Sequence, residues 1–426
     1  MEDILDLIYQ EIEKKYKTIN LIASENYVSK NILIALGSEL TNKYCEGYPG
    51  RRFYAGCENY DKIENITIDL AKKLFNVEYC NAQPHSGTQA NMAVYFSLLN
   101  IGDKILSLGM DCGGHISHGF FRSFSGNLYK NCYYQVDKKT ECVDLNIVED
   151  ITKKEHPQLI ICGASSYSQD WDYKGFREIA DKYNCILMCD MAHTAGIIAK
   201  NRLNNPLKYC HIVTSTTQKT LRGPRGGMIL MNKDFESNIV EKYKNNEKIE
   251  MMSNIINRNL FPGIQGGPHM NNIAAKGICF QEVLNDDFTI YIDNILKNAN
   301  KLCSLFIKNG YRVVSNGTKN HLFVVNLTDK NILGIDAEKS LEKVGIFVNR
   351  ETIPFDNKTF QTCNGIRIGV PAITTLGFKE NDMDDIFFLI DKTLKNINNE
   401  NILNNIKNEV FLKTNSIIKS KNNKNI

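Results

Sequence analysis

Short apolar runs alternate with amphipathic stretches between about residues 104 and 231, and this alternation predicts strands separated by helices. The runs are rich in β-branched and aromatic side chains, which favour strands. The predicted strands are 104–108, 132–136, 158–162, 185–190, 210–214 and 227–231, and the helical stretches between them include 144–155 and 174–183. The pattern indicates an α/β domain in which helices cover a large, mostly parallel sheet.

After about residue 280 the pattern changes to that of a smaller α+β domain. A long amphipathic stretch at 288–309 precedes strand-like runs at 311–315, 321–327 and 365–370. In the last run, Arg367 alternates with isoleucines, and an arginine so placed can bind a carboxylate through two parallel hydrogen bonds. We therefore expect three parts: a helical arm at 1–40, a large cofactor-binding domain at 41–280, and a small domain at 281–426 with a basic, frayed tail.

Lys219 is the strongest candidate for chemistry in the chain. It follows a predicted strand and lies among hydroxyls and glycines, with Arg222 and Arg225 nearby. Burial and neighbouring cations disfavour a lysine's ammonium form, which suits an amine that must react with a carbonyl. Asp190 ends another predicted strand. Ligands of such sheets bind beyond the carboxyl ends of the strands, where Lys219 and Asp190 would both lie.

A third feature is Ser86-Gly87-Thr88, which precedes an apolar run suited to a helix. The N–H groups that open a helix bind phosphate well, although a serine N-cap with a glycine turn is the simpler local interpretation. Together with Lys219 and Asp190, the motif meets the needs of pyridoxal phosphate. That cofactor requires a lysine, an anion at its ring nitrogen and donors for its phosphate.

The composition is that of a globular protein that handles small molecules. The 426 residues are 42% hydrophobic and 23% charged, with a formal net charge of +3 and no long basic face interleaved with aromatics, so we expect no nucleic-acid partner. No apolar run is long enough to span a bilayer, and the acidic start is unlike a presequence. Thirteen scattered cysteines without a Cys-x-x-Cys pair are typical of reduced thiols. We expect a cytoplasmic protein, or a mitochondrial one if a presequence has been removed.

These motifs, taken in order, resemble those of the serine hydroxymethyltransferases, and the resemblance runs over nearly the whole chain. These enzymes depend on pyridoxal phosphate and have fold type I, the aspartate-aminotransferase-like fold. They convert serine and tetrahydrofolate reversibly to glycine and 5,10-methylenetetrahydrofolate. The matching segments are 21–26, 42–50, 83–91, 113–115, 190–193, 217–220, 223–227, 261–268 and 365–369.

The resemblance implies a role for each candidate residue around the cofactor. Lys219 forms the internal aldimine, Asp190 pairs with the pyridine nitrogen and His115 stacks on the ring. The phenolic oxygen is bound by Ser165 and His193. The phosphate is bound by Ser86, Gly87 and Thr88, with Tyr44 and Gly267 from a neighbouring subunit. Such shared sites imply a homodimer or tetramer.

The resemblance also implies an amino-acid site. Arg367, Ser24 and Tyr54 bind the substrate carboxylate, and Glu46 acts as acid or base near the serine hydroxyl and the folate. Taken alone, Glu46 reads as a solvated loop acid and Arg367 as an ion-pair residue. His115 and His118 taken alone would be surface or core histidines as readily as metal ligands; no metal is expected.

Two residues depart from the family pattern. Gln218 stands where a histidine usually precedes the lysine, and Glu351 stands where an asparagine usually faces the pterin. Glutamine carries no charge, and a carboxylate accepts hydrogen bonds but does not donate them. Two alternatives therefore stay open: a folate-independent aldolase of β-hydroxy amino acids, and a catalytically weak subunit that partners an active paralogue.

Overall fold

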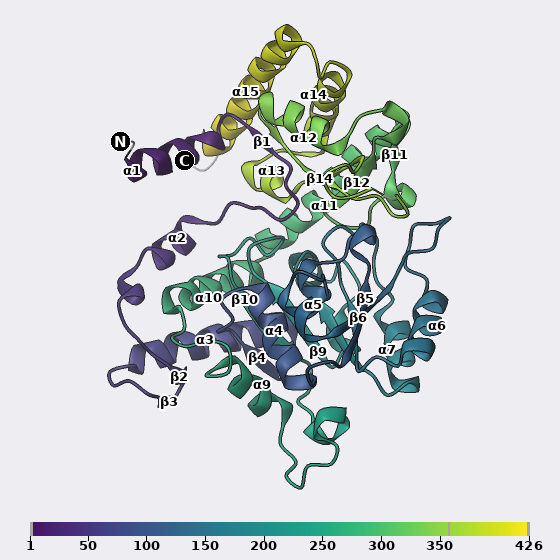
Figure 1. Cartoon of the computed structure of the whole chain (residues 1–426). Helices are drawn as coiled ribbons and strands as arrows, with labels where there is room; N and C mark the ends of the chain where they lie inside the picture. The colour runs from purple at the N-terminus through teal and green to yellow at the C-terminus, as the bar shows by residue number, and fades with distance from the viewer. Residues whose placement is uncertain (1–2, 357, 424–426) are drawn as a thin grey trace. The chain divides into compact units, whose positions relative to one another are not determined.

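The computed structural model describes residues 3–356 and 358–423, which form two compact units (Figure 1). The larger unit comprises Val28–Ser165 and Asp170–Thr289, and the smaller comprises Met1–Tyr27, Ser166–Gln169 and Ile290–Ile426. The candidate residues for the cofactor belong to the larger unit, whereas Ser24 and Arg367 belong to the smaller one.

A seven-stranded mixed sheet forms the centre of the larger unit. Its strand order is β4-β10-β9-β8-β7-β5-β6. All neighbours from β9 to β6 pair in parallel, whereas β10 is antiparallel to both β4 and β9. The strands are β4 (Tyr79–Asn81), β5 (Lys104–Leu108), β6 (Lys130–Tyr134), β7 (Leu159–Cys162), β8 (Ile186–Asp190), β9 (Ile212–Thr216) and β10 (Gly227–Met231). The predicted α/β fold with a mostly parallel sheet is confirmed.

Helices surround this sheet, and apolar side chains from both make the core. The central strands are buried along their whole length, as expected when a sheet is covered on both faces. One core cluster joins α4 and α9 to several strands. The helices of this unit are α2 (Lys30–Leu36), α3 (Glu58–Phe75), α4 (Gly87–Leu98), α5 (Phe124–Leu128), α6 (Leu145–Glu155), α7 (Tyr173–Lys182), α8 (Ala195–Ala199), α9 (Met252–Leu260) and α10 (Met270–Leu284).

Three details of this unit differ from the prediction. β4 was not predicted, because three residues are too few to show a period. β9 begins two residues later than predicted and continues through Ser215 and Thr216, whose polar side chains are buried in the strand. β6 lies two residues earlier than predicted. It is an edge strand with mixed burial, so its apolar pattern does not mark its ends.

The smaller unit contains a four-stranded antiparallel sheet in the order β11-β12-β15-β14. The strands are β11 (Arg312–Val313), β12 (Leu322–Asn326), β14 (Asn349–Glu351) and β15 (Gly365–Gly369). A separate parallel pair joins β1 (Ile19–Asn20) to β13 (Ile346–Phe347). The helices are α1 (Ile4–Lys14), α11 (Asp286–Lys308), which begins in the larger unit, α12 (Gly334–Lys343), α13 (Pro371–Leu376), α14 (Met383–Lys395) and α15 (Glu400–Asn423).

Two details of the terminal segments differ from what their sequences suggest. Ser24 lies in the segment 21–27, where a serine and an acid precede a helix and suggest a cap, but it does not cap that helix. That helix, α2, begins after Ser29, whose hydroxyl accepts a hydrogen bond from the Ile32 amide. The segment from 413 onward is helical rather than frayed, because α15 continues to Asn423. Lys413 pairs there with Asp382 and Asp385 at 2.7 Å each. Residues 424–426 of the predicted tail lie outside the described residues.

Within the described part of the chain, no helix combines the length and the apolar character needed to cross a bilayer.

Candidate active site

Lys219 lies three residues after β9. Only the side chain of Thr216 separates its amine from the amino end of α4. Its Nζ donates to Thr216 Oγ1 at 3.3 Å in a buried setting. On its other side Thr216 touches α4, since a Cβ added to Gly87 would lie 2.6 Å from Thr216 Cγ2. Thr216 therefore contacts both the lysine and the first residue of the helix.

The loop that carries Lys219 is fixed by its own hydrogen bonds. The Arg222 amide donates to the Lys219 carbonyl at 3.0 Å, and the Gly223 amide to the Thr217 carbonyl at 2.7 Å. Thr220 Oγ1 donates to the carbonyl of His193 at 2.8 Å. These contacts place the backbone of His193 beside the segment that holds the lysine.

Asp190 ends β8 with its carboxylate surrounded by donors. Oδ2 accepts from Asn91 Nδ2 at 2.9 Å and lies 3.0 Å from His118 Nε2, while Oδ1 accepts from the Ala192 amide at 3.1 Å. Burial opposes the charge, but the hydrogen bond and charge of His118, aided by the charge of His115, hold the pKa of Asp190 well below its usual range. The carboxylate is therefore ionised throughout the physiological pH range.

Asn91 joins Asp190 to α4 and to β9. It lies one helical turn after Gly87, and its Oδ1 accepts from Thr214 Oγ1 at 2.6 Å. Thr214 is the register partner of Asp190 across the β8–β9 pair. One helix thus contributes its amino end to the neighbourhood of Lys219 and a side chain to Asp190.

His115 precedes a short 3₁₀ turn, Ile116–His118, and caps it. Its Nδ1 accepts from the Ser117 amide at 3.2 Å and lies 2.7 Å from Ser117 Oγ. These contacts fix the ring orientation. The ligand atoms of His115, His118 and Asp190 lie within 4.8 Å of one another, an arrangement that would also suit a metal ion. The hydrogen bonds of Asp190 and the capping role of His115 account for these positions without one.

The segment before α4 is held by hydrogen bonds from a buried lysine, and Ser86 at its end caps the helix. Ser86 caps α4 by accepting from the Gln89 amide at 3.2 Å. The N–H groups of Gly87 and Thr88, which open the helix, have no intrahelical partners. The buried Lys276 donates to the carbonyls of Ala82, Pro84 and Gly227 at 2.8, 3.1 and 2.9 Å. Burial lowers the pKa of Lys276 to about 7. Thr88 is the second residue of the helix and is partly exposed.

Four other candidate residues gather around the hairpin of β2 (Gly47–Tyr48) and β3 (Arg51–Arg52). The Tyr44 and Tyr54 rings lie 5.5 Å apart between centroids. A Cβ on Gly267 would lie 3.1 Å from the Tyr44 ring, and one on Gly266 would lie 3.3 Å from a Glu46 carboxylate oxygen. Tyr44, Glu46, Tyr54 and Gly267 therefore form one cluster within the larger unit.

Arg367 is buried in the smaller unit, where it has polar neighbours. Its Nε donates to Asn349 Oδ1 at 3.1 Å and its Nη1 to Ser166 Oγ at 3.3 Å. Ser166 Oγ in turn donates to Glu351. Burial lowers the pKa of Arg367, and the charge of Glu351 opposes that effect.

The two remaining candidates are placed through their backbones. The Ser165 amide donates to the Gly113 carbonyl at 2.8 Å, two residues before His115. Ser24 follows Ala23, which packs so closely on Gly369 at the end of β15 that a Cβ added to that glycine would lie 2.4 Å from the Ala23 Cα. The structure therefore brings Ser24 toward the strand that carries Arg367.

The family model described as serine hydroxymethyltransferase matches residues 1–390. The chain belongs to the serine hydroxymethyltransferase family. It is also 48% identical over 394 residues to a serine hydroxymethyltransferase of Chlorobium phaeovibrioides, an alignment that covers 92% of this chain and 89% of that relative.

As a serine hydroxymethyltransferase, the protein is a pyridoxal-phosphate enzyme of fold type I. It interconverts serine and tetrahydrofolate with glycine and 5,10-methylenetetrahydrofolate. The resemblance in the motifs, the cofactor and the activity are thereby confirmed. The folate-independent aldolase and the weak subunit are not favoured.

The residues present fit pyridoxal phosphate by their own chemistry. An ionised, buried aspartate, a lysine at the end of the next strand and an open helix amino end lie together, joined through Asn91 and Thr216. Gln218, the departure beside Lys219, accepts from the Gly226 amide at 3.4 Å through Oε1, so its amide takes part in the loop.

Sequence reasoning assigned no role to Asn91, Thr214 or Thr216, and it weighed His118 only as a surface or core histidine or a metal ligand. One signal was available: Asn91 is four residues after Gly87, so both lie on the same face of a helix. The contacts of the other residues depend on strand pairing across the sheet, which the sequence does not display.

Proposed function

We propose that Lys219 holds the cofactor aldehyde, that Asp190 faces its ring nitrogen, and that Ser86, Gly87 and Thr88 bind its phosphate. The observation that carries this assignment is the position of α4. The helix places Gly87 beside the Thr216 hydroxyl that contacts Lys219, and it places Asn91 against Asp190. His115 would stack on the ring, with Ser165 and His193 at the phenolic oxygen.

Bound pyridoxal phosphate supplies an electron sink for breaking the Cα–Cβ bond of serine. The negative charge of Asp190 would keep a proton on the ring nitrogen of the bound cofactor, which would strengthen that sink. The Lys219 amine would hold the cofactor aldehyde until a substrate amine takes its place. Arg367, with Ser24 and Tyr54, binds the substrate carboxylate. Glu46 holds or removes a proton at the serine hydroxyl as the one-carbon unit passes to tetrahydrofolate.

Reductive trapping tests the assignment of the lysine. We expect borohydride treatment of the holoenzyme to fix the cofactor label on the peptide that contains Lys219, and the variant Lys219→Ala to lose both the label and turnover. The competing amine is Lys276, because its pKa of about 7 leaves much of it neutral near that pH. A label on Lys276 would overturn the assignment, and unchanged labelling in a Lys276→Met variant is the matched control.

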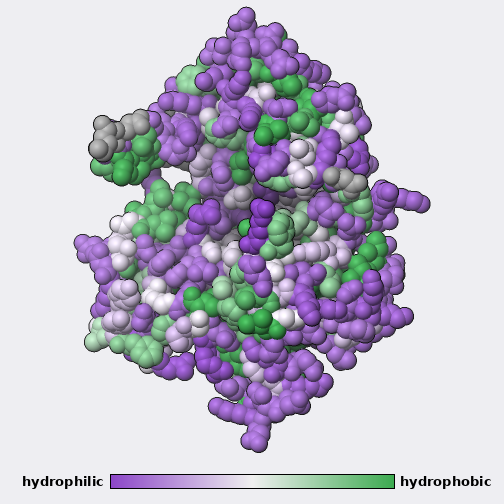
Figure 2. Space-filling model, in the orientation of Figure 1, coloured by the Kyte–Doolittle hydropathy of each residue, from purple (hydrophilic) through white to green (hydrophobic). Residues whose placement is uncertain are grey.

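We further propose that the protein is a homo-oligomer whose cofactor sites are shared between subunits. The support comes from apolar side chains that this chain leaves exposed. Ile4, Ile8 and Ile12 lie on one face of α1 and are 73%, 48% and 50% exposed, and Figure 2 shows this apolar surface. Tyr44, in the Glu46 cluster, is 61% exposed. A second copy of the chain would cover such surfaces.

We also propose a cytoplasmic location. None of the thirteen cysteines, all of which lie among the described residues, forms a disulfide, as is usual in a reducing compartment.

A further inference from the structure

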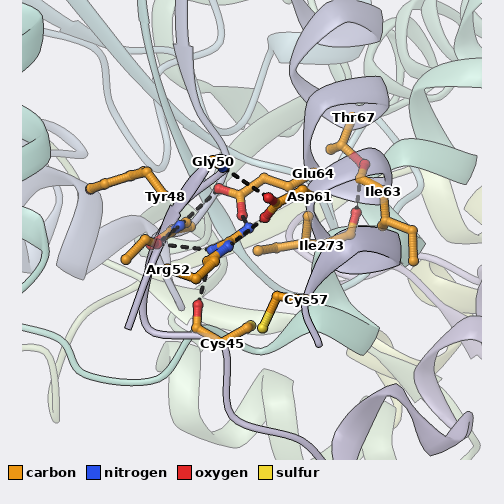
Figure 3. A network of polar contacts seen from close by, with 12 residues as sticks. Cys45, Tyr48, Gly50, Arg52, Cys57, Asp61, Ile63, Glu64, Thr67 and Ile273 are labelled. Carbon is orange, nitrogen blue, oxygen red and sulfur yellow. Dashed lines mark hydrogen bonds and ion pairs between the residues drawn. The ribbon is translucent and has the colours of Figure 1, made fainter. Parts of the chain in front are cut away.

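Arg52 forms the centre of a buried polar network in the larger unit (Figure 3). Its Nη1 donates to two carbonyls, those of Cys45 and Gly47, at 2.9 Å each. Its Nε donates to Asp61 Oδ1 at 2.8 Å and its Nη2 to Glu64 Oε2 at 2.5 Å. The guanidinium therefore uses four of its five donors within the protein.

The two carbonyls that Arg52 binds are those on either side of Glu46. The carbonyl of Glu46 itself accepts from the Phe53 amide at 2.9 Å. Gly47 has φ of +98°, and a Cβ there would lie 2.4 Å from the Arg51 carbonyl oxygen. Three consecutive carbonyls and a tight turn thus fix the peptide from which the Glu46 side chain projects.

The network also reaches the segment that leads to the phosphate loop. Gln83 Nε2 donates to the Gly47 carbonyl at 2.9 Å and to Glu64 Oε1 at 2.8 Å, and Gln83 lies three residues before Ser86. The side chains of Arg52 and Glu64 are only 4% and 1% exposed, so solvent does not screen these contacts. The network joins the Glu46 peptide to α3 and to the segment before α4.

We propose that Arg52 is a positioning residue that orients the Glu46 carboxyl for proton transfer at the substrate hydroxyl. The proposal rests on the acid–base role proposed above for Glu46. A lysine cannot replace Arg52, because a single ammonium group cannot reach two carbonyls and two carboxylates in the planar fork that a guanidinium offers. Arg52 acts through Glu46 and does not itself touch the substrate.

A double-mutant cycle on the holoenzyme tests this role, with Arg52→Lys, Glu46→Gln and the double variant. We expect Arg52→Lys to lower kcat for folate-dependent serine cleavage by about 10- to 100-fold, the range that a misplacement of about 1 Å can produce, with little change in the KM for serine. In the Glu46→Gln background the same substitution should change kcat less than about twofold. Arg51→Lys, at the exposed neighbouring position, is the matched control and should retain the parent rate.

Hydrogen exchange of the peptide covering residues 44–54 gives a readout that does not depend on turnover. Its amides should exchange faster in Arg52→Lys, while the strands of the main sheet keep their protection. If Arg52→Lys does not fold, Asp61→Asn removes one charged anchor at a partly exposed side chain and should give a smaller change in the same non-additive pattern.

The outcomes separate the two proposals. Suppose that Glu46→Gln lowers kcat. If Arg52→Lys then keeps the parent kcat, or if the two losses simply add in the double variant, the role of Arg52 is overturned and that of Glu46 stands. A Glu46→Gln variant with the parent rate overturns the role of Glu46, and the role of Arg52 with it.

Discussion

Asn91 and Asp190, which are 99 residues apart in the chain, are joined by a hydrogen bond of 2.9 Å from Nδ2 to Oδ2. The same asparagine accepts from Thr214 on the neighbouring strand. The aspartate is thereby held by a helix on one side and through the sheet on the other. Its position is a property of the fold, and it does not depend on a loop.

Replacement of Asn91 tests whether these two hydrogen bonds hold Asp190 in place. Asn91→Leu removes a donor from a buried carboxylate and an acceptor from the Thr214 hydroxyl. We expect the free energy of unfolding to fall by about 1–3 kcal/mol and cofactor binding to weaken, because buried polar groups would lose their partners. Denaturant unfolding and equilibrium dialysis measure the two effects. Asn300→Leu, at an exposed helical position, should change both by little.

Lys276 makes stability depend on pH in a defined direction. Its pKa is lowered to about 7 by burial, whereas a lysine in an unfolded chain titrates near 10.4. Between these values the unfolded chain binds a proton that the folded chain does not. The contribution of Lys276 to stability therefore rises with pH by up to about 1.4 kcal/mol per unit, and it is lost as pH falls through 7.

The variant Lys276→Met isolates that contribution. We expect the difference in unfolding free energy between parent and variant to increase from pH 7 to pH 10, as measured by denaturant titration at each pH. Lys73→Met, at an exposed site on α3, is the matched control for replacing a lysine by methionine without a change in the buried core. A constant difference for Lys276→Met would contradict the lowered pKa.

Glu351 is expected to weaken amino-acid binding, because its charge acts on the guanidinium proposed to bind the substrate carboxylate. Glu351→Gln keeps the acceptor for Ser166 and removes the charge. Glycine should then bind several-fold more tightly, since about 1 kcal/mol corresponds to about fivefold in affinity. Spectral titration of the holoenzyme measures this change. Glu338→Gln, whose partner is Arg350, is the control, and equal shifts in both variants would argue against the assignment of Arg367.

Shared sites predict complementation between two inactive variants. Lys219→Ala and Tyr44→Ala should each lose most activity as homo-oligomers. After mixing, unfolding and refolding together, hybrid dimers would contain one site with both residues intact, so activity should return to about one quarter of the parent value for random pairing of two subunits. Sites built from one chain alone would give no recovery.

Much of the fold and of the candidate site could be predicted because the chemistry lies at strand ends. Lys219, Asp190 and Ser165 each follow an apolar strand that the pattern reveals, and Ser86 precedes a helix with an ordinary cap. The supporting contacts could not be predicted, because Asn91, His118 and Arg52 act through partners brought close only by tertiary structure. Ser24 shows a related limit. Both Ser24 and Ser29 suit a helix cap, and the choice between them depends on packing around the end of β15.

The spacing within α4 has a consequence for vitamer selection. Gly87 and Asn91 are four residues apart, which corresponds to a rise of about 6 Å along the helix axis. Because the first is proposed to lie at the anionic ester and the second binds Asp190, the proposed partner of the heterocyclic nitrogen, this single helical turn would set the distance between the two ends of the cofactor site. Analogues whose phosphate arm is longer or shorter than that of the natural vitamer would satisfy one end only.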